Sequence, residues 1–243
     1  LFKYMFKIGD RKIGKNYPTY IIAELSCNHH GRLEEALRLV KAAKESGADA
    51  FKIQTYTGDT ITLNCNKKYF KLKNTSWDEK GNLWELFNMA HTPWEWQYKI
   101  QQEVNRLGMD FFSSPFDHTA VDFLEGLNVP AYKVASAEII DIPLLKKIAK
   151  TKKPVIMSTG MASLSEIEEG VKTLKENGTP CVALLKCTSA YPSKPEDANL
   201  LTIPHLSETF KCVTGLSDHT LGIGVPVTAV ALGANIIEKH FTM

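Results

Sequence analysis

Short apolar runs alternate with longer amphipathic stretches from residue 20 onward, and this alternation constrains the fold more than any other feature. Such a rhythm is typical of repeated βα units and a parallel sheet. We expect strands near 20–26, 50–54, 110–113, 131–134, 155–158, 182–186, 213–217 and 236–240. Eight such strands predict a closed (β/α)₈ TIM barrel in the α/β class.

The stretches between the expected strands carry the signals of amphipathic helices. Apolar residues recur at helical spacing over 33–43, before a stop at Ser46-Gly47. Ser163-Leu164-Ser165-Glu166 reads as a capping box, and Asn177-Gly178 ends the helix that it begins. No helical stretch follows the last expected strand, so we expect a barrel truncated after its eighth strand.

Two segments depart from the βα rhythm. Gly9-Asp10 separates two short runs and predicts a hairpin, so we divide the chain into an N-terminal hairpin extension, 1–19, and a barrel domain, 20–243. Residues 55–92 are too long for an ordinary βα loop. Because they follow the second expected strand, we interpret them as an active-site lid; a disordered insertion is the alternative.

The composition narrows the class of protein. The 243 residues are 44% hydrophobic and 23% charged with a net charge of +2, which fits one soluble domain without a basic stripe for nucleic acid. The five cysteines are odd in number and include no Cys-x-x-Cys pair, which favours reduced thiols in a cytoplasm. No run approaches the roughly 20 apolar residues of a membrane span. We therefore expect a cytoplasmic protein with small-molecule partners.

Polar side chains gather at the ends of the expected strands, where a barrel of this type places its active site. They are Lys52, Ser114, Lys133, Ser136, Ser158, Lys186, Ser217, His219, Glu238 and His240. Strand alternation puts Glu24, Lys52 and Gln54 on the interior side and leaves Phe51 and Ile53 for the helix layer. Converging ammonium and hydroxyl groups, with close backbone approach at Gly160, suit a phosphate and a carboxylate. The sequence therefore predicts a phosphorylated, anionic substrate.

Two histidines stand at matching ends of the last two strands. His219 ends one strand and His240 the next, and neighbouring strands lie about 4.8 Å apart, so both imidazoles can reach one metal ion. Such a site would be catalytic, because two protein ligands leave most of the coordination sphere open. A histidine at a strand end is also often merely polar; the matched pair beside Glu238 keeps both readings open. Lys239 has the opposite parity and is interpreted as structural.

Seven ordered motifs across nearly the whole chain resemble the sialic acid synthase family. They are Ile22-Ala23-Glu24, Gly47-Ala48-Asp49-Ala50-Phe51-Lys52-Ile53-Gln54, Ser113-Ser114-Pro115-Phe116, Pro130-Ala131-Tyr132-Lys133-Val134-Ala135-Ser136-Ala137-Glu138, Ser158-Thr159-Gly160-Met161, Gly215-Leu216-Ser217-Asp218-His219-Thr220 and Glu238-Lys239-His240-Phe241-Thr242. Within the family, the runs 91–96 and 186–192 look most like those of pseudaminic acid synthases.

The resemblance implies an activity: condensation of phosphoenolpyruvate with an N-acetylated amino sugar and water to a nine-carbon 2-keto sugar acid, here pseudaminic acid, plus phosphate. It implies that His219 and His240 bind Mn²⁺ or Mg²⁺. The residues that would hold phosphoenolpyruvate are Lys52, Ser114, Lys133, Ser136, Ser158 and Ser217. Those that would face the sugar are Gln54, Glu138, Ser189 and Tyr191. Glu24 and Glu238 are the candidates for the proton transfers, with Lys52 beside them.

The chain departs from the family pattern in two ways. Ser189 stands where synthases of N-acetylneuraminate often have Asn, which weakens assignment to that sugar. The family's C-terminal antifreeze-like domain, which lends an arginine to the partner subunit's site, does not follow here. We therefore expect a homodimer only of the full-length protein, and a fragment that is incomplete as a catalyst.

Other functions remain open from the sequence. The sugar acid could be N-acetylneuraminate or legionaminate. A Schiff-base aldolase on the same barrel would use Lys133 or Lys186 as its nucleophile. A catalytically silent barrel that binds sugar acids is a third reading, and the number of His, Lys and Glu residues at strand ends argues against it.

Overall fold

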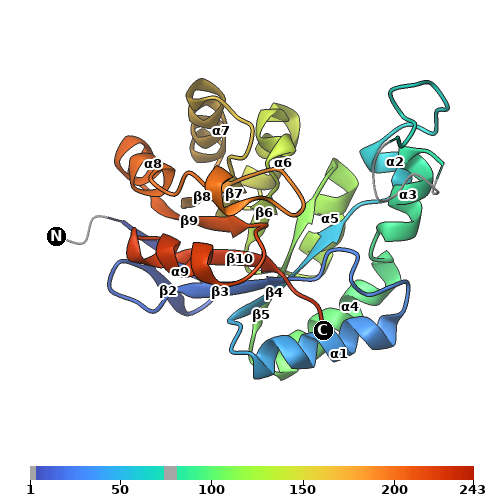
Figure 1. The fold of residues 1–243 in the computed structure, drawn as a ribbon, viewed down its shortest axis with the longest axis horizontal. Coiled ribbons are helices and arrows are strands. Elements are labelled where there is room, and N and C mark those ends of the chain that lie inside the picture. The colour runs from blue at the N-terminus through green and yellow to red at the C-terminus, as the bar shows by residue number, and fades with distance from the viewer. Residues whose placement is uncertain (1–3, 74–80) are drawn as a thin grey trace.

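A closed barrel of parallel strands forms the centre of the protein in a computed structural model that describes residues 4–73 and 81–243 (Figure 1). Its strands are β3 (Tyr20–Glu24), β4 (Ala50–Thr55), β5 (Asp110–Pro115), β6 (Tyr132–Val134), β7 (Val155–Ser158), β8 (Val182–Cys187), β9 (Val213–Asp218) and β10 (Ile236–His240). They follow one another in chain order around the barrel, and β10 pairs with β3 to close it. The predicted (β/α)₈ barrel is confirmed.

Helices cover the outside of the barrel, and each barrel strand from β3 to β9 leads to one of them (Figure 1). In chain order they are α1 (Leu33–Glu45), α4 (Trp94–Arg106), α5 (His118–Gly126), α6 (Ile142–Ala149), α7 (Leu164–Glu176), α8 (Thr202–Phe210) and α9 (Gly224–Ala231). Two 3₁₀ turns, η2 (Ala137–Ile140) and η3 (Pro195–Asp197), precede α6 and α8. The predicted capping box of α7 is present: the Ser163 N–H donates to Glu166 Oε2 over 2.7 Å.

The predicted N-terminal hairpin consists of β1 (Met5–Ile8) and β2 (Arg11–Gly14), which pair antiparallel. Its inward side chains, Phe6, Ile8 and Ile13, are buried and belong to the main hydrophobic core. Arg11 also forms a 3.1 Å ion pair with Asp49, just before β4. The hairpin therefore packs at the amino-terminal end of the barrel, opposite the strand ends that carry the candidate site.

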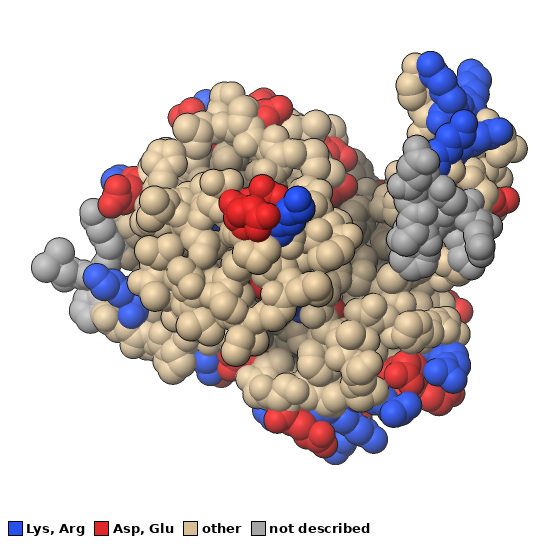
Figure 2. Space-filling view, in the orientation of Figure 1, with Lys and Arg blue, Asp and Glu red and all other residues tan. Residues whose placement is uncertain are grey.

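The long segment between β4 and α4 contains two short helices, α2 (Gly58–Ile61) and α3 (Leu83–Ala90), which pack against each other. We call residues 56–73 and 81–92 the excursion. It projects from the barrel in Figure 1, and Figure 2 shows lysines at its tip. Residues 74–80, part of the predicted lid, lie outside the described residues. The excursion starts at the carboxyl end of β4, as expected, and its movement as a lid stays a prediction.

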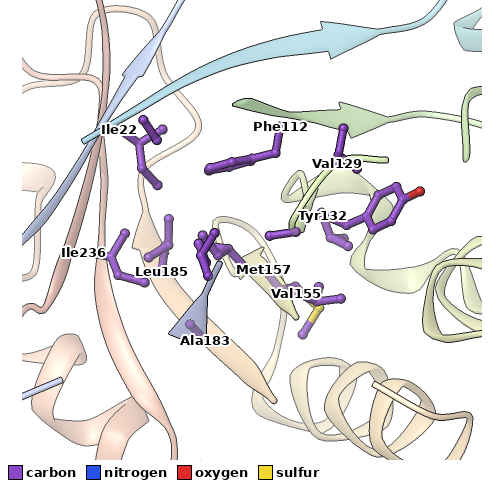
Figure 3. Packing of buried hydrophobic residues seen from close by; sticks show 14 of the residues in the cluster. Ile22, Phe112, Val129, Tyr132, Val155, Met157, Ala183, Leu185 and Ile236 are labelled. Carbon is purple, nitrogen blue, oxygen red and sulfur yellow. The ribbon is translucent and has the colours of Figure 1, made fainter. Parts of the chain in front are cut away.

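The barrel interior is apolar toward the amino ends of the strands and polar toward their carboxyl ends. Ile22, Phe112, Leu185 and Ile236 come from four different strands and belong to one buried cluster (Figure 3). Because side chains alternate along a strand, the next inward residue toward each carboxyl end lies one layer higher. After Ile22, Phe112 and Ile236 these residues are Glu24, Ser114 and Glu238, so the fold places these polar side chains at the carboxyl end of the barrel. None of the helices in 4–73 and 81–243 has the length and apolar character of a membrane span.

Candidate active site at the carboxyl end of the barrel

A cavity of about 1230 Å³ opens at the carboxyl ends of the strands. Every residue that the family resemblance assigned to catalysis, substrate or metal lines it. These residues are Glu24, Lys52, Gln54, Ser114, Lys133, Ser136, Glu138, Ser158, Ser189, Tyr191, Ser217, His219, Glu238 and His240. The structure thus brings together side chains from all eight barrel strands and the loops that follow them.

Two lysines and two glutamates form a buried cluster at the bottom of this cavity. Lys52 makes an ion pair with Glu24 and lies 3.9 Å from Glu238 Oε1, measured from its Nζ. Lys133 Nζ lies 3.8 Å from the same Glu238 oxygen. All four side chains are almost fully buried. Removing four charges from water is costly unless they pair, and here each ammonium faces a carboxylate.

The two carboxyl groups of this cluster differ in acidity. Burial raises the pKa of Glu24, and Lys52 only partly opposes this. Burial also acts to raise the pKa of Glu238, but the ammonium groups of Lys133 and Lys52 outweigh it, so that pKa falls below its ordinary value. Burial lowers the pKa of Lys133. A pair of carboxyl groups with opposite shifts can divide the roles of proton donor and proton acceptor.

Hydroxyl groups surround the two ammonium groups. Lys52 Nζ donates to Ser114 Oγ over 3.3 Å, and Lys133 Nζ donates to Ser158 Oγ over 2.7 Å. Nearby, the Gly160 N–H donates to Ser136 Oγ over 3.1 Å. Such a set of cations, hydroxyls and backbone donors matches the oxygens of a phosphate or carboxylate.

Gly160 is required by close approach. A Cβ at this position would lie 2.4 Å from Ser189 Oγ and 2.7 Å from Ser136 Oγ, far inside van der Waals contact. The glycine therefore lets two predicted substrate-binding hydroxyls converge on the same point of the backbone. The expected close approach of the Gly160 backbone to a bound anion stays a prediction.

The two histidines at the ends of β9 and β10 lie side by side. Their ring centroids are 5.3 Å apart, and Tyr191 stacks on His219 with a centroid separation of 4.0 Å. His219 Nδ1 lies 2.7 Å from the carbonyl oxygen of Thr188. Because a carbonyl can only accept, Nδ1 must carry the proton, so Nε2 is the ring nitrogen that would coordinate an ion.

The donor set at this end fits a divalent ion. Glu238 Oε2 is buried with no hydrogen-bond partner in the described part of the chain, and it belongs to the same cavity as both imidazoles. No preformed group of three or more His, Cys, Asp or Glu side chains arranged for a metal occurs among residues 4–73 and 81–243. The two histidines would therefore hold an ion together with water or substrate oxygens, as an open catalytic site requires.

One residue that we expected at the site, Lys186, lies outside the cavity, and other residues that line the cavity were not expected. Lys186 does not line the cavity; its Nζ donates to the carbonyl of Cys187 and to Thr188 Oγ1. The inward residue at the end of β8 is Cys187, which the alternation of that strand could have identified. This removes Lys186 as a cavity nucleophile.

The excursion also lines the cavity. Its lining residues were not predicted individually from the sequence. Ile61 of α2 and Leu86, Phe87 and Met89 of α3 line one side of the cavity. Asn82 caps α3 by accepting from the Glu85 N–H over 2.9 Å, so an Asn-x-x-Glu capping box in the sequence signalled this helix. The excursion therefore supplies apolar side chains to the cavity.

Known proteins are similar to this chain in sequence and in fold. The chain is 49% identical to a pseudaminic acid synthase of Campylobacter jejuni over 93% of its own length and 65% of the relative's. A pseudaminic acid synthase of Helicobacter pylori is 46% identical over 93% of the chain and 66% of that protein. The chain thus spans about two thirds of the length of these curated relatives.

A solved structure and a family model agree with these relatives. The crystal structure of an N-acetylneuraminic acid synthetase from Leptospira borgpetersenii, in complex with citrate, superposes with a TM-score of 0.87 at 36% identity. It covers 98% of this chain and 78% of that one. The model of the NeuB family matches residues 39–243. By sequence and by fold, this chain is a member of the NeuB family.

Proposed function

We propose that the full-length protein condenses phosphoenolpyruvate with an N-acetylated amino sugar and water, and releases a nine-carbon 2-keto sugar acid and phosphate. One observation carries the proposal: two buried ammonium groups, ringed by hydroxyls, share a cavity with a pair of adjacent imidazoles and two carboxyl groups. The ammonium and hydroxyl groups suit a small substrate with two anionic groups. The imidazoles and carboxyl groups suit proton transfer and carbonyl activation.

Phosphoenolpyruvate would bind at the bottom of the cavity. Its phosphate and carboxylate would be held by Lys52 and Lys133, with hydrogen bonds from hydroxyls beside each ammonium. The hydroxyls in reach of that position are those of Ser114, Ser136, Ser158 and Ser217. Because both lysines already face Glu24 and Glu238, substrate anions would replace carboxylate contacts that exist before binding.

His219 and His240 would hold Mn²⁺ or Mg²⁺. Such an ion, when bound, acts as a Lewis acid toward the sugar aldehyde and stabilises negative charge on its oxygen. The Thr188 carbonyl fixes the His219 tautomer, and the stacked Tyr191 ring restricts its rotation. The protein thus orients the His219 imidazole before any ligand enters.

The reaction needs one proton delivered and one removed. The methylene carbon of phosphoenolpyruvate attacks the aldehyde carbon, and the aldehyde oxygen takes up a proton to become a hydroxyl. Water then adds to the former enol carbon and loses a proton; the C–O bond to phosphate breaks as the remaining hydroxyl proton passes to the leaving phosphate, which leaves the 2-keto group. Glu24, whose pKa is raised, suits delivery of the first proton, and the carboxylate of Glu238 suits removal of the second.

The apolar side chains of the excursion favour an acceptor with few hydroxyls. The precursor of pseudaminic acid, 2,4-diacetamido-2,4,6-trideoxy-altrose, carries an acetamido group and a methyl where N-acetylmannosamine carries hydroxyls. Ile61, Leu86 and Met89 offer those groups an apolar surface. Gln54, Glu138, Ser189 and Tyr191 lie on the same cavity and would bind the remaining polar groups. We therefore propose a pseudaminic acid synthase.

The choice of sugar is tested with the full-length protein, phosphoenolpyruvate, Mn²⁺ and either sugar, by following phosphate release. An apolar pocket rejects an added hydroxyl by only about a hundredfold. We expect a higher kcat/KM for the diacetamido sugar, up to that ratio, and measurable turnover of both. Faster turnover of N-acetylmannosamine, or of the legionaminate precursor, would contradict the pseudaminic assignment and leave the synthase assignment in place.

A further inference from the structure

The side chain of Lys239 joins the residues on both sides of His219, although its own strand carries His240. Lys239 immediately precedes His240 in β10, and Asp218 immediately precedes His219 in β9. Lys239 Nζ makes an ion pair with Asp218 Oδ2 and donates a 2.6 Å hydrogen bond to the carbonyl of Thr220. One ammonium therefore holds the strand end that presents the neighbouring imidazole.

Asp218 completes this arrangement from the other side. It is 2% exposed, and its Oδ1 accepts hydrogen bonds from the Thr220 N–H over 3.0 Å and from Thr220 Oγ1 over 2.8 Å. Its Oδ2 faces Lys239. Both carboxylate oxygens are thus used, and they fix the turn that leads away from His219. A buried network that is fully satisfied in this way is rigid.

This ion pair stands where the strand ladder stops. The parallel pairing of β9 with β10 ends at Asp218 and Lys239, and His240 pairs only with β3, opposite Glu24. Beyond that point no ladder contact sets the distance between the two histidines. The Lys239 side chain is one connection from β10 to the residues around His219; the others are the Ser217–Glu238 hydrogen bond and the Tyr191 ring, which packs on both imidazoles.

Neither residue of the pair touches the cavity. Asp218 and Lys239 have the opposite parity to Ser217, Glu238 and the histidines, and neither lines the cavity. We propose that Lys239 and Asp218 are positioning residues that hold the imidazoles of His219 and His240 at the separation needed for one divalent ion. This inference rests on the proposed function, because it presupposes that the two histidines bind that ion.

The test measures Mn²⁺ affinity in the full-length protein, by electron paramagnetic resonance of the free ion, for Lys239→Met. Partners that orient metal ligands typically contribute 10- to 100-fold in affinity, so we expect the Kd for Mn²⁺ to rise by about that factor. The affinity for phosphoenolpyruvate without metal should stay within about twofold of the wild-type value. General destabilisation would not weaken Mn²⁺ binding while leaving phosphoenolpyruvate binding unchanged. Lys153→Met is the matched control, since Lys153 makes a comparable 2.7 Å ion pair with Glu125 outside the cavity.

The outcomes separate this inference from the proposed function. Absence of Mn²⁺ binding by the unaltered protein would contradict the metal site and the inference together. Unchanged Mn²⁺ affinity in a folded Lys239→Met protein would overturn the inference alone. If that variant does not give the wild-type circular dichroism spectrum, Lys239→Gln, which retains a donor for the Thr220 carbonyl, is measured by the same criteria. Failure of both variants to fold would show that the pair serves the fold and would also overturn the inference.

Discussion

The chemistry of the site depends on buried charges that are paired before substrate arrives. Lys52 faces Glu24, and Lys133 faces Glu238, in a cluster almost free of solvent. An unpaired buried charge would be far more costly than a pair, so each lysine depends on its glutamate until a substrate anion replaces it. A substrate with two anionic groups can bind those ammonium groups in place of the carboxylates. The carboxyl groups are then available for proton transfer.

Replacing either lysine by methionine should weaken phosphoenolpyruvate binding. Lys52→Met and Lys133→Met each remove a charged hydrogen-bond donor while nearly keeping the volume, so we expect a loss of about 1.5 to 3 kcal/mol in binding free energy by calorimetry. Lys147→Met, which removes a surface lysine paired with Asp122, is the control and should bind as the wild type does. Wild-type affinity in both cavity variants would exclude these lysines from the phosphoenolpyruvate site.

Single residues were predictable where strand alternation decided their direction. Glu24, Lys52 and Glu238 follow the inward parity of their strands, and the structure places all three in the cavity. Lys186 was assigned from its position at a strand end alone, and the alternation of β8 turns it away in favour of Cys187. The contacts of Lys239 were not predictable, because an outward lysine on a strand gives no sign of its partner.

At the scale of elements, β9 and β10 approach each other more closely than side chains would allow. A Cβ on Gly215 would lie 2.1 Å from the carbonyl oxygen of Ile236 and 2.8 Å from its Cβ. Both atoms belong to the strand that presents His240. The glycine therefore lets the two histidine-bearing strands pack at their observed separation.

Gly215→Ala should accordingly destabilise the barrel. Because backbone atoms must move to admit the methyl group, we expect a loss of about 1 to 3 kcal/mol in the free energy of unfolding, measured by urea denaturation. Gly126→Ala, in α5, is the control: nothing lies within 4 Å of its added Cβ, and the change should be neutral or slightly stabilising. Equal stability of the two variants would show that β9 and β10 can separate without cost.

The elements with a regular period could be predicted, and the irregular ones could not. Every barrel strand was expected within a few residues, because apolar runs bounded by turns are clear in the sequence. The excursion has no such period over 56–73, and α2 is a single turn, so its apolar side toward the cavity depends on tertiary packing. Only the Asn82 capping box gave a local signal.

At the scale of the whole molecule, the surface around α9 carries few charged side chains and several exposed apolar ones. Figure 2 shows this face around α9, and no charged residue occurs in that helix. Leu221, Ile223 and Val227 are 79%, 77% and 63% exposed. A contiguous apolar surface of this kind is a site of association in soluble proteins.

The 243-residue polypeptide should therefore self-associate through this face. We expect a mass above that of the monomer by size-exclusion chromatography with light scattering, and a shift toward monomer in Ile223→Glu, because a carboxylate there would have to be desolvated. Met161→Glu, at an equally exposed apolar residue after β7, is the control and should not change the mass. A monomeric wild-type polypeptide at micromolar concentration would refute the prediction.

In the proposed reaction, the full-length protein joins phosphoenolpyruvate to an amino sugar with cleavage of the C–O bond. The most direct measurement supplies phosphoenolpyruvate, Mn²⁺ and the diacetamido sugar in oxygen-18 water, and analyses the released phosphate by mass spectrometry. We expect unlabelled phosphate, formed only when the sugar is present and not by the His219→Ala variant. Labelled phosphate would show that water attacks phosphorus, and release without sugar would show simple hydrolysis; either result would exclude the proposed condensation.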